Sequence, residues 1–269
     1  MNVGNRTTVA ALSAPFHTGN YRALGNVLLH CKGRRDLLRR YLRAGGEYPY
    51  RCAMSTPVGD VAPTLYSSHD VNTVVEVFFR GDYPAPSNLK TVVDIGSNIG
   101  LSAMYFLTRN RDSRCYLYEP VPRNVARLRD NLAAFESRWV LDECAVGLEA
   151  GVAAFGIEDT GRYGGLAVRT DKHIDVRVRE VNEVLGSVLE IEPRIDVLKI
   201  DVEGLEADLV LAIRPDLLAR VERIYFEAER LPLHTDRYDH EFDHATNRLY
   251  RRADSGGVGG TRRPVGLLG

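Results

Sequence analysis

Four acidic residues come at the ends of short apolar runs in this chain: Asp94, Glu119, Asp201 and Glu227. Each run has the length and the β-branched composition of a buried strand. Open α/β sheets bind ligands at the carboxyl ends of their parallel strands. Since packing a sheet does not require an acid at each strand end, we expect these four side chains to line a ligand-binding crevice.

The first acid opens a glycine-containing turn. Residues 91–100 read Thr-Val-Val-Asp-Ile-Gly-Ser-Asn-Ile-Gly, a helical stretch follows over 101–110, and a second short strand over 115–118 leads to Glu119. Such a strand–turn–helix–strand unit places backbone N–H groups and a helix N-terminus beside a ligand. Glu119 lies nineteen residues past the last glycine, where an acid can accept hydrogen bonds from a ribose diol. The unit predicts a nucleoside-binding crevice.

The spacing of the turn bears on which nucleoside binds. It runs Asp94-x-Gly96-x-Asn98-x-Gly100, with a carboxylate where a dinucleotide-binding turn has its first glycine. A carboxylate there repels a diphosphate but can pair with the ammonium of an amino-acid-bearing nucleoside. This chemistry fits S-adenosylmethionine. A tight turn with no ligand is the alternative for the glycine motif alone, and Glu119 at the matching place on the next strand counts against it.

Composition sets broad bounds on the fold and function. The 269 residues suffice for one large domain, or for a domain with a small appendage. The formal net charge of −1 gives no sign of nucleic-acid binding. Cys31, Cys52, Cys115 and Cys144 form no Cys-x-x-Cys pair, so we expect buried free thiols in a reducing compartment. Neither a signal peptide nor a membrane span is recognisable, which predicts a cytoplasmic protein.

The chain is expected to have three parts. Residues 1–88 predict a helical and hairpin segment that acts as a lid, residues 89–250 an S-adenosylmethionine-binding domain, and residues 251–269 a glycine-rich tail. Within the first part, helical periodicity over 21–43 is interrupted at Gly33, a hairpin is expected around Thr56–Asp60, and Asp70 is expected to cap the next helix. The second helical piece carries five arginines: Arg34, Arg35, Arg39, Arg40 and Arg43. We favour a solvated helix face for them over contact with an acidic partner, a phosphorylated substrate or a membrane.

Two further stretches contribute candidate site residues. Residues 139–146 predict a third strand. The small and apolar Ala145 and Val146 at its end could contact the edge of an adenine ring, but an ordinary strand end explains them almost as well. Residues 195–204 read Ile-Asp-Val-Leu-Lys-Ile-Asp-Val-Glu-Gly, a buried strand with Asp201 at its carboxyl end. Glu203 could instead serve as a helix-capping carboxylate.

Residues 236–252 are rich in histidine, acids and aromatic residues. The run from His240 to His244 formally satisfies a His-Glu-x-x-His zinc pattern, but short patterns of this kind occur by chance. We therefore favour a polar helix near the crevice and predict no metal site.

Together these stretches resemble the FkbM family of S-adenosylmethionine-dependent methyltransferases over about residues 70–230. The resemblance is carried by residues 76–83 (Glu-Val-Phe-Phe-Arg-Gly-Asp-Tyr), 92–102, 118–120 (Tyr-Glu-Pro), 145–147 (Ala-Val-Gly) and 198–204 (Leu-Lys-Ile-Asp-Val-Glu-Gly). It implies an α/β, Rossmann-like class I methyltransferase fold, with a mostly parallel sheet and helices on both faces. It also implies O-methylation of a small-molecule or glycan acceptor, through a hydroxyl of a sugar, a glycan or a secondary metabolite.

The resemblance assigns roles to the candidate residues. It implies that the glycine turn lines the methionyl side of the cofactor and that Glu119 binds the ribose. It also implies that Ala145 contacts the edge of the adenine and that Asp201 faces the methyl group. The full set of expected cofactor-binding residues is Asp94, Gly96, Ser97, Asn98, Gly100, Glu119, Pro120, Ala145, Val146 and Asp201. Removing the proton of an aliphatic hydroxyl needs a base, for which Asp201 is the first candidate and His69 and His234 are alternatives. Mg²⁺ bound by Asp201 and Glu227 could act instead, but the sequence has no strong metal signature.

One departure from the family pattern concerns the C-terminus. Sheets of this kind usually finish with a strand pair after the fifth strand, whereas residues 255–264 are glycine-rich. We therefore expect the closing pair to be missing, or Pro264–Leu268 to supply one short edge strand. This keeps open a non-catalytic nucleoside-binding protein left by C-terminal loss, with a nicotinamide dehydrogenase as a third alternative.

Overall fold

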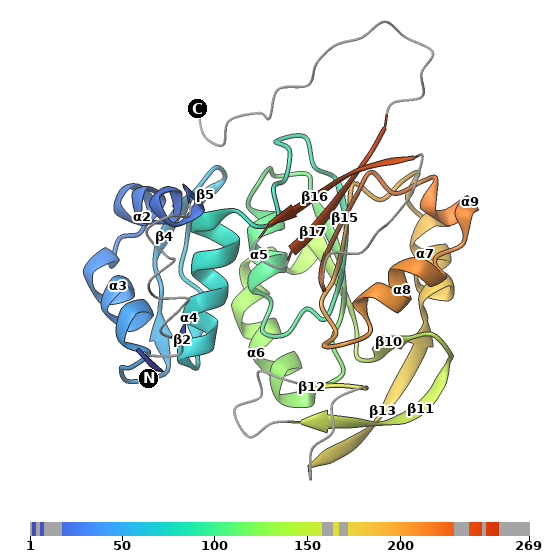
Figure 1. The fold of residues 1–269 in the computed structure, drawn as a ribbon, viewed down its shortest axis with the longest axis horizontal. Coiled ribbons are helices and arrows are strands. Elements are labelled where there is room, and N and C mark those ends of the chain that lie inside the picture. The colour runs from blue at the N-terminus through green and yellow to red at the C-terminus, as the bar shows by residue number, and fades with distance from the viewer. Residues whose placement is uncertain are drawn as a thin grey trace, which may run out of the picture. The chain divides into compact units, whose positions relative to one another are not determined.

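The computed structural model describes residues 2–3, 6–7, 18–157, 164–166, 172–228, 237–243 and 246–252 (Figure 1). The chain divides into two compact units, Met1–Pro84 and Ala85–Gly269. In the described ranges, none of the helices combines the length and hydropathy of a transmembrane segment.

The N-terminal unit contains short strands and three successive helical segments. Gly33 separates the first two helices, as predicted, and the hairpin around Thr56–Gly59 is also confirmed. Asp70 takes part in capping the next helix, although not as the N-cap: Ser67 is the N-cap, and Asp70 is its partner three residues later in a capping box. The elements are β1 (Asn2–Val3), β2 (Arg6–Thr7), α2 (Thr18–His30), α3 (Arg34–Arg43), β3 (Tyr50–Arg51), β4 (Met54–Thr56), β5 (Gly59–Val61), β6 (Thr64–Leu65), α4 (Ser68–Val74) and the π-helix η2 (Val75–Arg80).

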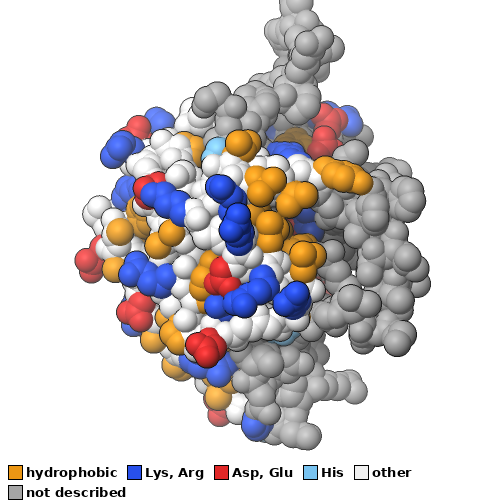
Figure 2. All heavy atoms as spheres, turned by 90° about the vertical axis from the view of Figure 1, so that its left-hand side faces the viewer, with side chains coloured by type: hydrophobic (Ala, Val, Ile, Leu, Met, Phe, Trp, Pro, Cys, Tyr) orange, Lys and Arg blue, Asp and Glu red, His pale blue; other side chains and the backbone are white. Residues whose placement is uncertain are grey.

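The arginines of α3 are solvent-exposed with one exception. Figure 2 views the side of the molecule that carries α2 and α3, where Lys and Arg side chains alternate with hydrophobic ones. Arg40 is buried, and its guanidinium lies 4.2 Å from the ring centroid of Tyr50 and donates hydrogen bonds to Asp36 and to the carbonyl oxygen of Glu47. The predicted solvated face therefore holds for the other four arginines, while Arg40 stabilises the packing of its own unit.

The second unit is built on a seven-stranded sheet in the order β16-β17-β15-β14-β7-β8-β9. Five neighbouring strands run parallel, and β17 and β16 complete the sheet antiparallel. This is the mostly parallel α/β sheet of the class I methyltransferase fold, as predicted. The strands are β7 (Thr91–Ile95), β8 (Arg114–Tyr118), β9 (Trp139–Asp142), β14 (Val197–Ile200), β15 (Arg223–Glu227), β16 (Tyr238–Asp243) and β17 (Thr246–Arg251).

The C-terminal strands overturn two expectations. The closing pair is present as the β16–β17 hairpin, so the prediction that it is missing or reduced to one strand is wrong. The polar helix expected over 236–252 is also wrong, because pairing with β15 buries the polar side chains Thr246, Asn247 and Arg248 within the sheet. His240 lies on a strand, which removes the helix face that a His-Glu-x-x-His zinc motif needs. His244 and the segment Pro264–Leu268 lie outside the described residues.

A second sheet branches from the first. The strand expected over 139–146 is two strands, because the chain leaves the main sheet after Asp142 and enters a four-stranded sheet at Ala145. Arg177 and Arg179 form ion pairs with the carboxylate of Asp142 and so connect the two sheets. The second sheet has the order β10-β13-β11-β12, with β10 (Ala145–Gly147), β11 (Gly151–Ile157), β12 (Gly164–Gly165) and β13 (His173–Glu180).

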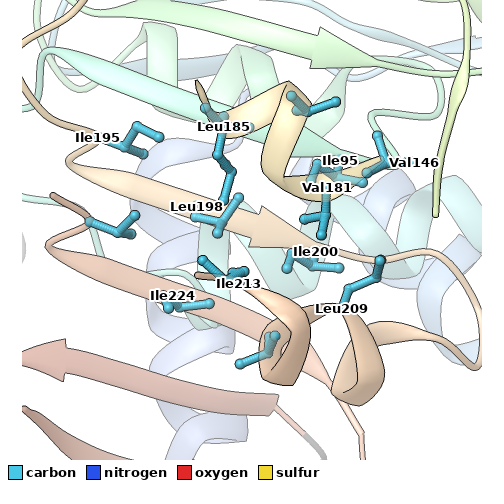
Figure 3. Packing of buried hydrophobic residues seen from close by; sticks show 14 of the residues in the cluster. Ile95, Val146, Val181, Leu185, Ile195, Leu198, Ile200, Leu209, Ile213 and Ile224 are labelled. Atoms are coloured by element: carbon cyan, nitrogen blue, oxygen red, sulfur yellow. The ribbon is translucent and has the colours of Figure 1, made fainter. Parts of the chain in front are cut away.

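Helices cover both faces of the main sheet (Figure 1). On one face, alternate strand residues such as Leu198 and Ile224 pack with Leu185 and Leu209 in one hydrophobic cluster (Figure 3). Alternation then directs the intervening residues, Lys199 among them, to the opposite face. The first face is covered by α7 (Val181–Leu189), α8 (Glu206–Ala212) and α9 (Pro215–Leu218), and the second by α5 (Leu101–Leu107) and α6 (Pro122–Leu132), which the 3₁₀ helix η3 (Ala133–Arg138) follows.

Candidate active site

Acidic residues lie at the carboxyl ends of adjacent parallel strands of the main sheet. The strand order brings the ends of β15, β14, β7 and β8 side by side, and with them Glu227, Asp201, Asp94 and Glu119. A fifth acid, Asp142, ends β9 at the same edge and was missed in the sequence. The change from apolar residues to Asp142-Glu143-Cys144 was the available signal, since it marks the true end of the strand.

The turn after β7 depends on its two glycines. Gly96 has a φ of +78°, and a Cβ there would overlap the backbone carbonyl oxygen of Asp201 and lie 2.9 Å from its carbon. Gly100, with a φ of +83°, is the N-cap of α5, and a Cβ there would press on Leu128 and Leu132 of α6. Only glycine adopts these conformations without strain, so the turn brings its backbone unusually close to the end of β14.

A buried ion-pair network lies beneath this turn. The Nζ of Lys199 is 3.1 Å from Oδ1 of Asp94 and 3.3 Å from Oδ2 of Asp201, and it donates a hydrogen bond to the carbonyl oxygen of Gly96. Burial opposes the charge on Lys199, but the two carboxylates outweigh it and raise the pKa of the ammonium above its ordinary value. Lys199 is thus a cation that joins the glycine turn to the end of β14.

Asp94 has partners within the protein at both carboxylate oxygens. Oδ1 pairs with Lys199, and Oδ2 accepts a hydrogen bond of 2.6 Å from the hydroxyl of Ser102 at the start of α5. The side chain is fully buried. The proposed pairing of Asp94 with a ligand ammonium stays a prediction, and the network with Lys199 is what the sequence did not predict.

Glu119 is held by donors from three places. Its carboxylate accepts hydrogen bonds from the N–H of Asn98 (2.9 Å), the N–H of Val121 (3.0 Å) and the side-chain amide of Asn124 (3.2 Å). Burial nevertheless raises the pKa of Glu119 to about 7, because the charged form is desolvated more strongly than these donors favour it. Glu119 is therefore poised to change its protonation state near neutral pH.

Ser97 and Asn98 shape the turn through hydrogen bonds. The Ser97 hydroxyl donates to the carbonyl oxygen of Asp94 and accepts from the N–H of Tyr118, which fixes the turn to β8. Asn98 has a φ of +48°, a left-handed conformation that asparagine tolerates and that directs its N–H at Glu119. Pro120 follows Glu119 directly and is half-buried.

The two residues predicted at the adenine edge point to different clusters. Val146 packs in the main core beside Val181 (Figure 3), whereas Ala145 packs with Val121 and Phe155 in a smaller cluster. Both side chains are buried, and contact of either one with an adenine ring stays a prediction.

Asp201 is the most open carboxylate of the network, with 36% of its side chain exposed. The loop after it passes through Glu203, which has a φ of +57°, and ends at Glu206, the first residue of α8. Glu206 accepts hydrogen bonds from the N–H groups of Val202 (3.2 Å) and Gly204 (2.8 Å). Glu206 thus fixes the loop that precedes α8, whereas the N-cap of that helix is Leu205, so the capping role considered for Glu203 is wrong.

The roles considered for the two histidines as bases stay predictions. His69 lies in the first turn of α4 in the N-terminal unit, and His234 lies outside the described residues. Glu227, at the end of β15, is exposed. Within the part of the chain that the structure describes, no three His, Cys, Asp or Glu side chains are grouped so that they could hold a metal ion.

Comparison with solved structures finds methyltransferases among the matches. An FkbM methyltransferase from Methylobacillus flagellatus KT is 16% identical with a TM-score of 0.45, and the match covers 68% of this chain and 54% of that one. A methyltransferase from Geobacter sulfurreducens is also 16% identical, with a TM-score of 0.38, and the match covers 62% of this chain and 73% of that one.

A curated relative is much longer than this chain. The AMB antimetabolite synthetase AmbE of Pseudomonas aeruginosa strain PAO1 is 26% identical over 195 residues, which are 57% of this chain and 9% of that protein. The model of the methyltransferase FkbM domain matches residues 94–254, a range that starts at the buried acid of β7 and runs past the closing hairpin. This chain therefore belongs to the FkbM methyltransferase family.

Proposed function

We propose that this protein is an S-adenosylmethionine-dependent O-methyltransferase that acts on a hydroxyl of a sugar, a glycan or a secondary metabolite. The observation that carries the proposal is the coupling of the glycine turn to Glu119. The N–H of Asn98 in that turn donates to the same carboxylate that lies at the end of the neighbouring strand. This proximity of a backbone turn and an acid at the end of the next strand supports a nucleoside site in which Glu119 binds the ribose.

The donor and acceptor set fits an adenosine with a zwitterionic amino-acid tail. Three hydrogen bonds occupy most of the Glu119 carboxylate, and Oε2, which accepts only from Asn98 among them, retains a lone pair for a ribose hydroxyl. The network of Asp94, Lys199 and Asp201 has one cation and two carboxylates, so it carries a net negative charge suited to a cationic sulfonium and unsuited to a diphosphate. The glycine turn, Glu119 and Asp201 are the residues that would hold the cofactor.

When bound, S-adenosylmethionine supplies a methyl group on a cationic sulfur that an oxygen can displace in line. The protein's own residues then have two tasks. The turn and Glu119 orient the nucleoside, and such positioning can account for up to about 7–11 kcal/mol of the barrier. Asp201, the partly exposed carboxylate at the end of β14, accepts the proton of the attacking hydroxyl, and Lys199, 3.3 Å away, holds this carboxylate in place.

The test separates binding from transfer. Calorimetry with S-adenosylhomocysteine measures binding, and transfer of a tritiated methyl group to a panel of hydroxylated acceptors measures activity. We expect Asp201→Asn to bind S-adenosylhomocysteine but to lose at least about 100-fold in transfer, the typical contribution of a general base. Asp216→Asn is the matched control, because Asp216 is an exposed carboxylate of α9 that forms an ion pair with Arg214. Normal transfer by Asp201→Asn would remove Asp201 from the mechanism.

The structure removes the reason for the non-catalytic alternative. The non-catalytic alternative depended on a missing closing pair, and both β16 and β17 are present. For a nicotinamide dehydrogenase, calorimetric binding of NAD with no binding of S-adenosylhomocysteine is the required result, and it would overturn the methyltransferase proposal.

A further inference from the structure

Cys31 and Cys52 lie against each other in the N-terminal unit. Cys31 pairs with Met54 in an isolated antiparallel bridge, and the N–H of Lys32 donates to the carbonyl oxygen of Ala53 at 2.9 Å. This pairing brings the connection between β3 and β4 alongside the turn between α2 and α3. The side chains of Cys31 and Cys52 are hydrogen-bonded to each other, so the two sulfurs are neighbours.

The surroundings of Cys31 favour its thiolate. Cys31 lies two residues before Gly33, the N-cap of α3, and Gly33 donates its N–H to the Cys31 sulfur. The hydrogen bond from Cys52, the N–H of Gly33 and the charge of Arg34 together lower the pKa of Cys31, although burial acts in the opposite direction. Helix N-termini and nearby cations activate cysteines in this way.

Cys52 has the complementary character. Its hydrogen bond to Cys31 and its burial both raise the pKa of the Cys52 thiol, whereas the pKa of Cys31 is lowered, so Cys52 holds its proton more tightly than Cys31 does. The pair therefore combines a nucleophilic sulfur with an adjacent thiol that can resolve an oxidised product.

The other two cysteines provide an internal comparison. Cys115 and Cys144 are equally buried and are also free thiols, but they lie in the second unit. Burial raises the pKa of Cys115 well above its ordinary value and the pKa of Cys144 to about 12. Buried thiols of this kind are expected to be inert.

We propose that Cys31 and Cys52 form a redox-modification site that reacts with a small peroxide and closes to an intramolecular disulfide. The thiolate of Cys31 attacks one oxygen of hydrogen peroxide, the O–O bond breaks, and the departing hydroxide takes up a proton to become water. Cys52 then gives up its proton and attacks the sulfenic acid of Cys31, so that an S–S bond forms, the S–O bond breaks and a second water leaves. Two thiols lose two electrons in all, and the peroxide gains them.

The experiment treats the folded full-length protein with hydrogen peroxide and then blocks the remaining thiols with N-ethylmaleimide. Tryptic digestion without reduction separates the two cysteines, since cleavage follows Lys32 and Arg51. We expect a disulfide-linked peptide pair containing Cys31 and Cys52, and an upward shift of the melting temperature on oxidation, because a cross-link reduces the entropy of the unfolded chain. Cys115 and Cys144 should still be thiols.

Variants assign the two roles. Cys52→Ser should stop at a sulfenic acid on Cys31 that dimedone labels, whereas Cys31→Ser should leave Cys52 a thiol. Cys144→Ser, the matched control, should form the disulfide at the wild-type rate. Thermal melts establish that each variant is folded before treatment.

Three results would overturn the proposal. In the first, all four thiols survive peroxide while the protein stays folded. In the second, Cys115 or Cys144 is oxidised as fast as Cys31. In the third, the disulfide forms only in denaturant, which would mean that the folded geometry contributes nothing.

Discussion

Glu119→Gln offers a quantitative test of the buried carboxylate beside the glycine turn. The substitution keeps the shape of the side chain and removes its ability to ionise. Burial raises the pKa of Glu119 from its ordinary value of 4.5 to about 7. The folded protein therefore binds a proton that the unfolded chain has already released between these two pH values.

The sign and size of the effect follow from that difference. A raised pKa contributes stability that is complete below pH 4.5 and is lost as the pH rises through about 7. With about 1.4 kcal/mol for each unit of pKa, the loss in the free energy of unfolding is about 3 kcal/mol. The wild type should lose this amount relative to Glu119→Gln across that window, measured by urea unfolding at a series of pH values.

Ligand binding should act on the same proton. Ribose hydroxyls donate hydrogen bonds to an ionised carboxylate, so binding of S-adenosylhomocysteine should lower the pKa of Glu119 and release a proton below pH 7. Calorimetry in two buffers of different ionisation enthalpy measures this release, and Glu119→Gln should show none. The reasoning is refuted if wild type and variant keep a constant difference in stability from pH 4.5 to 7 and release equal numbers of protons.

Substitutions of Lys199, Gly96 and Glu206 probe the architecture around the site, and Gly186→Ala serves as a control. Lys199→Met leaves the carboxylate of Asp94 buried without its cation, and should lower the free energy of unfolding by about 3–5 kcal/mol. Adding Asp94→Asn should recover much of this loss. A loss below about 1 kcal/mol in urea unfolding would contradict this reasoning. Gly96→Ala should abolish S-adenosylhomocysteine binding, because its Cβ overlaps the backbone at the end of β14. Gly186→Ala, in the middle of α7 with nothing within 4 Å of its Cβ, should raise stability by about 0.5–1 kcal/mol; equal behaviour of the two glycine variants would show that the close approach is unimportant. Glu206→Ala removes the acceptor of two loop N–H groups and should cost about 1–3 kcal/mol in thermal or urea unfolding, and an unchanged melting temperature would count against that role.

The local parts of the site could be predicted from the sequence. The turn with Gly96 and Gly100 and the acid at Glu119 belong to one continuous strand–turn–helix–strand unit, whose signals are close together in the chain. The ion pair between Asp94 and Lys199 could not be predicted, because its members are 105 residues apart and meet only through the pairing of β7 with β14.

The error over residues 236–252 has a physical cause. Polar composition suggested a helix over 236–252, but tertiary pairing decides strand formation more strongly than composition does. Asn247 illustrates this, since its side chain is buried and its amide donates to the carbonyl oxygen of Ala228 while its oxygen contacts His240. Such polar residues give no apolar periodicity, although they are as buried as a core residue.

The contact of Gly96 with the backbone of Asp201 has a consequence for engineering. The two loops pack in direct contact there, so an atom added to one of them would displace the other. Chimeras that exchange only one of them between homologous enzymes should misfold locally, whereas exchanging both together should preserve the fit. A recombination library for this family should therefore treat residues 94–100 and 199–206 as one inherited block.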